Sequence, residues 1–592
     1  MRIPARKLPV TLILAVILLL QVSATQQVAA QPLLISITTE GNVEGTSTIQ
    51  RNGNIYTFTS NLEEGSIVIE ASNIVLDGAG FTLGEIYRID GDNVEIKNLK
   101  MNAEVNAIEI YGSGCKILDN EIQAGYTGIR IRESNNNVIS GNKIDAEAGV
   151  GIAFETSSNN EVTRNRVTSS IIEGVSLTYS DYNTFSGNNI NFVSTYKSSY
   201  NTFVGNNFPQ GLNIRQSSNY NNITGNSILD FNQLAETSIA SSGSISIERG
   251  EGNLVSSNII VNSGGIFLDT SSGNVLRNNS VSGTGIGFEV SGSPQPKLSS
   301  FINDIDDSNT IDGKKIYYLI NKSYLSINPS TYPKIGYLAL VNCTRMIVEN
   351  THFNTQGILL AWTKDSQITN NDISNNYGDG VILNYASNNK ITKNNINANS
   401  GAGIRLTYSN QNIVSGNYIT RNQMGIYLIH LASNNTIAEN NIADQDTGIH
   451  FYMASDNLIY HNNFVNNTKP VYDAYWETRG MPFSYVLPSE NVWDNDYPAG
   501  GNYWSNYTNM YPEAEELDSS GIWETPYIID ENNQDRYPLL DPLVIPQIQV
   551  PDGETPTKPT EESFPTTLVI ASVIAVAVVG VGLLVYFKKH KR

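Results

Sequence analysis

Apolar residues alternate in short runs that recur along the chain at a nearly constant spacing. In the unit that opens at Gly128 they occupy Ile129 and Ile131 and return at Ile139 and Ile144. Runs with a period of two and this length predict β-strands and not helices. A glycine opens each such unit at intervals of 22 or 23 residues within two series, at 128, 151 and 174 and at 357, 380, 403, 425 and 448. A repeat in the twenties predicts a solenoid.

Two solenoids fit this period. A leucine-rich repeat requires a leucine ladder and a helical segment in each unit, whereas these units are β-branched, rich in Asn and punctuated by Gly. A parallel β-helix lays two or three strands of each coil onto the coil below, at about 4.8 Å spacing. We therefore predict an all-β fold, a right-handed single-stranded parallel β-helix of roughly fifteen to seventeen coils.

Pairs of asparagines five residues apart recur in nearly every unit. Stacked coils would align them in ladders, in which each amide bonds to the same amide one coil away. We interpret these residues as scaffold and not as a binding site. The pairs are Asn137/Asn142, Asn160/Asn165, Asn183/Asn188, Asn253/Asn258, Asn274/Asn279, Asn389/Asn394, Asn412/Asn417, Asn435/Asn440 and Asn457/Asn462.

The two ends of the chain predict export and anchoring. Residues 1–30 have a basic start, an apolar run and small residues before the expected cleavage point, as in a secretory signal. Residues 568–587 are apolar and uncharged, and the basic residues 588–592 follow them. This pattern predicts one transmembrane helix with a cytoplasmic tail, hence a single-pass type I protein of the cell membrane. Residues 546–567, rich in Pro, Thr and Glu, are expected to form an extended stalk.

The composition of the chain limits the classes of molecule that it is expected to bind. The chain of 592 residues has a net charge of −21, which disfavours nucleic acid and is compatible with cations and neutral polymers. Its two cysteines, Cys115 and Cys343, are predicted to be buried and unpaired, because about ten coils separate them. Export makes N-glycosylation sequons relevant. They occur at Asn222, Asn278, Asn321, Asn342, Asn434, Asn466 and Asn506.

Four segments resemble the NosD-type, carbohydrate-binding and sugar hydrolysis (CASH) β-helix family, especially its membrane-anchored archaeal surface members. They are IYTFTSNLEEGSIVIEASNIVLDGAGFTL from Ile55, the repeats themselves, NTIDGKKIYYLINKS from Asn309, and GNYWSNYT from Gly500 with TPYIIDENNQDRYPLLDP from Thr525. The resemblance implies a β-helix with caps. The expected organisation is an N-terminal cap at 31–64, coils at 65–289, an irregular insertion at 290–340, coils at 341–466 and an aromatic-rich cap at 467–545.

The resemblance also raises the question of metals. Copper sites need His, Met or Cys close together, and the chain has no HxH, MxxM or CxxC motif. Calcium needs clustered oxygen ligands at alternating positions, and the acidic residues around Glu513, Glu515, Glu516 and Asp518 lack that spacing. We predict neither a copper nor a calcium cofactor.

Carboxylates at turns are the candidate catalytic residues. Enzymes of this fold class that cleave glycosidic bonds need an acid and a base flanking the bond. Asp379, Asp444 and Asp446 precede Gly380 and Gly448, whose turns are three coils apart, or roughly 14 Å. That separation does not assemble a site from these residues alone, and their preference for turns explains them as well.

Aromatic residues recur five positions after the opening glycine in the C-terminal units. Trp362, Tyr385 and Tyr408 are followed there by His430 and Met453. Facing outward, such a row could stack on the sugar rings of a polymer. Facing inward, it is a core ladder, which the alternation of positions one, three and five favours.

The expected function is non-catalytic binding of carbohydrate or a cell-surface polymer. A polysaccharide hydrolase or lyase is the first alternative, and its mark would be three or more carboxylates or Lys/Arg clustered on adjacent coils. A structural envelope or adhesion protein is the second, and it would have no polar and aromatic groove.

Overall fold

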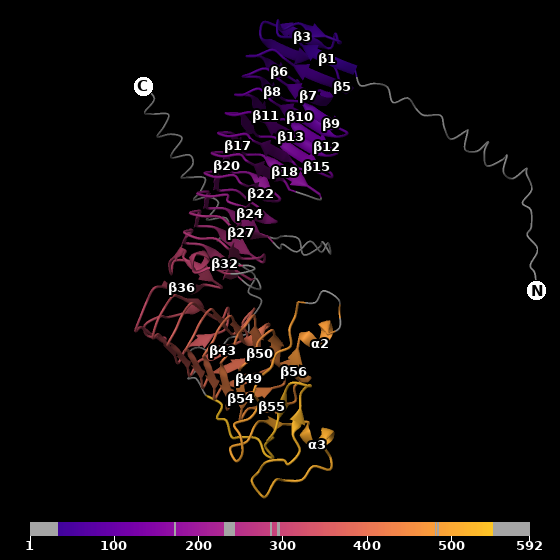
Figure 1. Cartoon of the computed structure of the whole chain (residues 1–592). Coiled ribbons are helices and arrows are strands. Elements are labelled where there is room, and N and C mark those ends of the chain that lie inside the picture. Colours follow the sequence, from indigo (N-terminus) through magenta and orange to yellow (C-terminus); the bar gives the residue numbers. More distant parts are fainter. Residues whose placement is uncertain are drawn as a thin grey trace, which may run out of the picture. The chain divides into compact units, whose positions relative to one another are not determined.

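Short parallel strands stack coil upon coil through nearly all of the computed structural model, which describes residues 33–170, 173–229, 243–283, 287–292, 296–479, 481 and 485–548 (Figure 1). Successive coils pair in register, so Ile129 lies beside Ile152 and Ile152 beside Val175. The fold is an all-β parallel solenoid of about 18 turns, which confirms the predicted class of fold, with slightly more turns than predicted.

The predicted signal at 1–30 and the apolar stretch at 568–587 with its basic tail lie outside the described residues, as does nearly all of the stalk. In the described part of the chain, no helix has both the length and the apolar character needed to cross a bilayer.

The first stack, as we call the coils from β1 (Leu33–Ile37) to β35 (Thr310–Ile311), contributes three strands per coil. One coil contains β13 (Thr127–Arg132), β14 (Val138–Ser140) and β15 (Lys143–Ala146). The strands equivalent to β13 form its first face. They are β1, β5 (Leu62–Ile69), β7 (Thr82–Ile89), β10 (Asn106–Ile110), β13, β16 (Ile152–Glu155), β19 (Val175–Thr178), β22 (Val193–Tyr196), β24 (Gly211–Arg215), β27 (Ser244–Glu248), β30 (Ile266–Asp269) and β33 (Phe288–Ser291).

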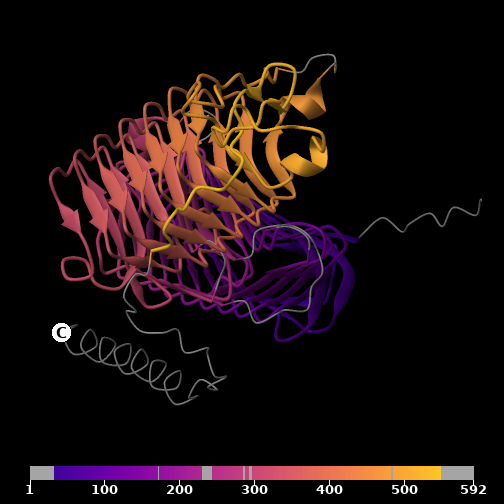
Figure 2. The same cartoon turned by 90° about the horizontal axis from the view of Figure 1, so that it is seen from below.

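The second stack runs from β36 (Lys314–Ile320) to β56 (Lys469–Asp473), and Figure 2 shows its strands side by side. A representative coil contains β44 (Val381–Asn384), β45 (Lys390–Thr392) and β46 (Asn395–Asn397). Its first face consists of β36, β38 (Ile335–Val341), β41 (Ile358–Ala361), β44, β47 (Ala402–Thr407), β50 (Met424–Ile429), β53 (Thr447–Tyr452) and β56.

The two stacks join by a change of face. Strand β35 belongs to the third face of the first stack, with β26 (Ser227–Leu229), β29 (Ile259–Val261) and β32 (Ser280–Ser282), and it pairs antiparallel with β36. The third face of the first stack therefore continues as the first face of the second. The segment 290–340, expected to be an irregular insertion, supplies β36 and most of β38 to this sheet.

Apolar residues one and three positions after each opening glycine fill the interior, as predicted. Ile358, Leu360, Val381 and Leu383 are all buried. The interior comprises two hydrophobic clusters, one mainly in each stack. Cys115 and Cys343 are buried and free, and burial raises the pKa of the Cys115 thiol to about 11.

The asparagine ladders form as predicted, with more bonds than a chain of amides requires. The Oδ1 atom of Asn417 accepts both the backbone N–H and the Nδ2–H of Asn394, each at 3.0 Å. Asn417 repeats this pattern with Asn440, and its Nδ2 also donates to the carbonyl of Ile391 at 2.7 Å. Each buried amide thus satisfies backbone groups at a turn that no strand pairing reaches.

The segment after β56 closes the last coil. Strand β57 (Tyr503–Trp504) pairs with β55 (Asn463–Val465), and the indole of Trp504 stacks between Phe464 at 4.3 Å and Tyr527 at 4.1 Å. One ladder ends here on a carboxylate, because Asp535 Oδ2 accepts the N–H of Asn502 at 2.7 Å and the Trp504 indole N–H at 2.9 Å. Burial raises the pKa of Asp535 to about 7. The helices are short: η1 (Leu298–Phe301), α2 (Tyr475–Thr478) and α3 (Tyr507–Met510).

Candidate functional site

The aromatic row five positions after the opening glycines lies on the outside of the second stack, half-buried. Each residue in it has a positive φ, 50° at Trp362 and Tyr385 and 49° at Tyr408. A left-handed residue ends the strand and turns the chain, so alternation no longer determines where the side chain points. The prediction that the row faces inward is therefore wrong.

The faces of these rings are covered by one another. Trp362 and Tyr385 stack at 4.8 Å with an interplanar angle of 1°, Tyr385 and Tyr408 at 4.7 Å, and Tyr408 and His430 at 5.3 Å. Phe301 packs edge-on against Trp362 at one end and Tyr452 against His430 at the other. A sugar would meet ring edges here, so the row is not the stacking platform that the sequence suggested.

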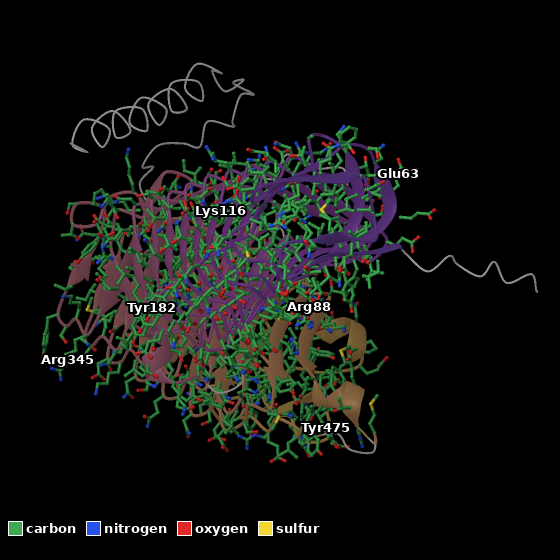
Figure 3. All side chains as sticks on the ribbon, turned by 90° about the horizontal axis from the view of Figure 1, so that it is seen from above. Glu63, Arg88, Lys116, Tyr182, Arg345 and Tyr475 are labelled. Atoms are coloured by element: carbon green, nitrogen blue, oxygen red, sulfur yellow. The ribbon has the colours of Figure 1, made fainter. Side chains whose placement is uncertain are left out.

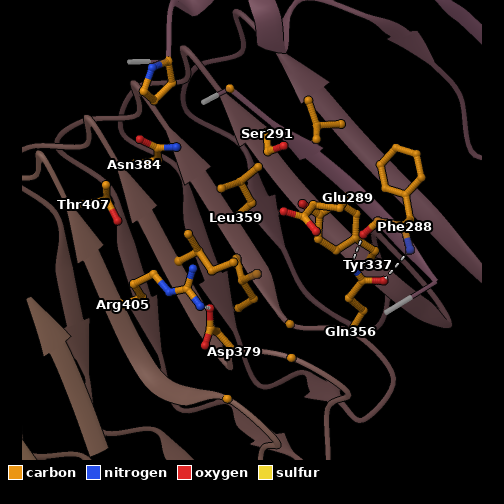
Figure 4. Close-up of a pocket in the computed structure, with 18 of the residues that line it drawn as sticks. Phe288, Glu289, Ser291, Tyr337, Gln356, Leu359, Asp379, Asn384, Arg405 and Thr407 are labelled. Atoms are coloured by element: carbon orange, nitrogen blue, oxygen red, sulfur yellow. Dashed lines mark hydrogen bonds and ion pairs between the residues drawn. The ribbon is translucent and has the colours of Figure 1, made fainter. Parts of the chain in front are cut away.

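A cavity of about 530 Å³ opens where the two stacks meet. Its walls come from β33, the last first-face strand of the first stack, and from the first face and adjoining turns of the second stack between β38 and β50. Tyr408 and His430 border it. We call it the junction pocket, and Figure 4 shows its side chains.

Strand β33 borders the junction pocket because the stack ends there. Among the described strands it pairs with β30 and with none on its other side. The side chain of Gln356 partly takes the place of a neighbouring strand: its Oε1 accepts the N–H of Phe288 at 3.0 Å, and its Nε2 donates to the carbonyl of the same residue. The rest of this edge adjoins the cavity.

An ion pair crosses the junction pocket between adjacent coils. Asp379, in the turn before β44, pairs through Oδ2 with Nη2 of Arg405 on β47 at 2.5 Å, as Figure 4 shows. Its Oδ1 accepts the N–H of Ala402 at 2.6 Å. The Asp379 side chain is 4% exposed and that of Arg405 is 41% exposed, so the carboxylate is fixed from the protein side and the guanidinium is accessible.

Glu289 lies on the opposite wall, on β33. Glu289 is an exposed residue, yet partial desolvation by the surrounding protein raises the pKa of its carboxyl group; Arg405 opposes that effect, and the negative charges of Asp269 and Asp379 reinforce it. Glu289 makes no ion pair with any described residue. The pocket thus holds one carboxylate paired with Arg405 and one without a counterion.

Two buried polar atoms of residues that line the junction pocket have no hydrogen-bond partner among the described residues: Nε of Arg405, a donor, and Oδ1 of Asn384, an acceptor. Buried polar groups in folded proteins are nearly always bonded, so each such atom needs an explanation. Both residues line the cavity, but each of these atoms exposes less than 1 Å² to solvent, so a ligand in the cavity would meet the exposed parts of the two side chains.

The candidate catalytic residues separate in the structure. Asp379 lines the junction pocket, whereas Asp444 and Asp446 are exposed and do not border it. The sequence did not indicate Glu289, Arg405 or Asn384. The one signal for this site was the break in the repeat after residue 289, which marks the junction.

The sequons lie at or near the surface. Asn278, Asn321, Asn342, Asn434 and Asn466 are exposed, and Asn222 and Asn506 are half-buried. Their occupancy stays a prediction.

Potential soft metal ligands are scattered. His450 Nδ1 lies 3.2 Å from the sulfur of Met424, and His461 Nε2 lies 2.7 Å from the carbonyl of Ala499. His352 pairs with Asp372 at 3.2 Å, and His430 belongs to the aromatic row. In the described part of the chain, no three His, Cys, Asp or Glu side chains gather as a metal site would require.

Solved structures with partial likeness include DFA-IIIase from Arthrobacter chlorophenolicus A6 in complex with GF2, at 16% identity over 42% of this chain and 73% of that one, with a TM-score of 0.28. The periplasmic alginate epimerase AlgG aligns at 9% identity over 72% of this chain and 78% of that one, with a TM-score of 0.17. At these scores neither bears on the chemistry of the present pocket. No curated protein matches the chain significantly.

The match to a protein family is extensive. The model of the family described as "Periplasmic copper-binding protein (NosD)" matches residues 58–238 and 300–509. These ranges cover coils of both stacks and the aromatic block at Trp504, hence most of the segments whose resemblance the sequence indicated; the block from Thr525 lies beyond them. The chain therefore belongs to the NosD family of parallel β-helix proteins.

Proposed function

We propose that this chain is a membrane-anchored protein on the outer face of an archaeal cell that binds carbohydrate or a cell-surface polymer in the junction pocket. The observation that carries the proposal is the junction pocket itself, which the side chains of Asn384 and the partly exposed Arg405 line. Sugar hydroxyl groups both donate and accept hydrogen bonds, so one ring edge can bond to both side chains. The cavity volume of about 530 Å³ is within the usual range for ligand pockets.

Anchoring is part of the proposal because of the sequence. The apolar stretch at 568–587 and the basic residues at 588–592 are the features that support a single spanning helix. The net charge of −21 supports a polymer partner and not nucleic acid.

The family description implies copper, and the described residues do not fit it. The nearest soft ligands, His450 and Met424, form a pair without a third donor, and the His450 ring packs between Tyr427 at 4.5 Å and Tyr472 at 4.8 Å. We assign copper no role in the proposed function.

A glycan array probed with the purified full-length chain tests the proposal. We expect binding to at least one polysaccharide class, with about tenfold weaker affinity after Asn384→Ala, since that change removes a ligand hydrogen bond. Asn213→Ala is the matched control, because Asn213 Oδ1 on β24 is likewise buried and unpartnered but does not line the junction pocket. Equal loss in both variants, or no binding to any glycan, would contradict the proposal.

A polysaccharide hydrolase or lyase is the second candidate. Glu289, Asp379 and Arg405 in one pocket are the clustered ionisable groups that such an enzyme needs. Release of reducing ends or unsaturated sugars from an array hit would support this candidate, and binding without product would support the non-catalytic one.

A further inference from the structure

The charges around the junction pocket do not balance. Arg405 is the only cationic side chain that lines it among the described residues, and it is already paired with Asp379 at 2.5 Å. Glu289 remains without a cation. The excess charge next to β33 is therefore negative.

A second carboxylate adds to this excess from the neighbouring coil. Strands β30 and β33 are paired so that Asp269 lies beside Ser291, whose hydroxyl donates to Asp269 Oδ1 at 2.9 Å. No described cation pairs with Asp269, and its charge acts on Glu289. Two carboxylates on adjacent coils thus share one region without a counterion.

Aromatic walls flank the unpaired carboxylate. Phe288 and Tyr337 are buried beside Glu289, with ring centroids 5.6 Å apart, and Figure 4 shows Glu289 next to Tyr337. Glu289 itself is an exposed residue, so its carboxylate is open to a cation that enters the pocket. Aromatic rings near the same position also favour a cation through their electron-rich faces.

A negatively charged sugar would not suit this pocket. Its carboxylate would face Glu289 and Asp269, while the only lining guanidinium is engaged with Asp379. A neutral sugar would leave the imbalance as it is. A protonated amine on the sugar would remove it.

We propose that the saccharide bound in the junction pocket is an amino sugar with a free, positively charged amine, and that Glu289 on β33 is the group that pairs with this amine. The inference rests on the carbohydrate-binding function proposed above and specifies its ligand class. The hydroxyl groups of the same sugar bond to the side chains of Arg405 and Asn384.

Isothermal titration of the full-length chain with two short probes tests this specificity. The probes are a glucosamine disaccharide and its N-acetylated counterpart, compared at a pH where the free amine is protonated. Disaccharides limit the general attraction of a polycation to an acidic protein. We expect the free amine to bind at least tenfold more tightly, with one site per chain.

The variant Glu289→Gln should abolish this preference by weakening the free-amine probe alone. Glu161→Gln is the matched control, because Glu161 is an exposed glutamate on β17 (Glu161–Thr163), away from the pocket, and it should retain the preference.

The outcomes separate the two proposals. Binding of either probe without preference for the amine, or a preference that survives Glu289→Gln, overturns the amino-sugar inference and leaves carbohydrate binding in place. Failure of every saccharide, in this titration and on the array, overturns both. The comparison of the two probes uses the wild-type chain, so it holds even if a variant folds poorly.

Discussion

The asparagine ladders and the junction pocket are both rich in polar side chains, but these side chains differ in how completely they are paired. In the ladders each described amide meets backbone and amide partners on neighbouring coils, as Asn417 does with Asn394 and Asn440. In the pocket a donor and an acceptor are left over, and a carboxylate has no counterion. Polar abundance therefore does not mark the site in this protein, whereas the cavity and the unpaired carboxylate that lines it do.

Breaking a ladder should have the largest effect on stability. Asn417→Ala leaves the N–H and Nδ2–H groups of Asn394 and the carbonyl of Ile391 without this partner in the interior. At roughly 1–3 kcal/mol for each buried unsatisfied group, we expect a loss of about 5 kcal/mol. Denaturant unfolding measures it, and Asn532→Ala, at an exposed asparagine in the cap, should change stability little. Similar losses in both variants would contradict the role given to the ladders.

The ladder end at Asp535 should make stability depend on pH. Its pKa is raised to about 7 in the folded chain, against 3.8 ordinarily, so the folded state binds the proton more tightly. Stability from this group is present below about pH 4 and is lost as pH rises towards 7, by about 4 kcal/mol in total. Thermal unfolding between pH 4 and 8 should show this slope, and Asp535→Asn should remove its contribution. An unchanged slope in the variant would assign the effect elsewhere.

Breaking the ion pair in the pocket should cost less, because Arg405 is partly exposed. Arg405→Leu leaves Asp379 buried without its cation, and we expect a loss of about 2 kcal/mol. Adding Asp379→Asn should restore most of it, since the double variant has no unpaired charge. Urea unfolding of the two single variants and the double variant measures this coupling. Purely additive losses would show that the two residues do not stabilise each other.

The smallest expected effect concerns the aromatic row and tests whether this row contributes to binding. Tyr385→Leu removes a ring that stacks on both Trp362 and Tyr408 but does not line the junction pocket. We expect a stability loss of about 1 kcal/mol and unchanged glycan affinity. A large loss of affinity at normal stability would restore the row as a sugar platform.

A second aromatic column shows that stacking along the coils is a general result of the repeat. Tyr182 and Tyr200 stack at 4.9 Å, and Tyr200 and Tyr220 at 5.3 Å, with each side chain about half exposed. Figure 3 labels Tyr182 on the outer surface of the first stack. Rings at equivalent positions in coils this closely spaced pack face to face.

Structural features that recur in every coil could be predicted from the sequence, whereas features that occur once could not. The positions of Ile358 and Leu360 in the core and of Asn417 in a ladder follow from periodicity, because each coil repeats the environment of the one before. The position of the Trp362 side chain could not be predicted from this periodicity, because the left-handed backbone conformation of Trp362 itself breaks the alternation. Glu289 and Arg405 meet only because β35 and β36 exchange faces, a long-range event without a periodic signal.

Because the pocket forms at this exchange of faces, the number of coils elsewhere in the protein does not affect the residues that line it. The pocket draws on the last strand of one first face, β33, and on a few coils just beyond the junction. Whole coils can be gained or lost towards either end during evolution while these walls keep their neighbours. Under the function proposed above, related proteins of different lengths would hold the same ligand at different distances from the membrane, so that reach and recognition vary independently.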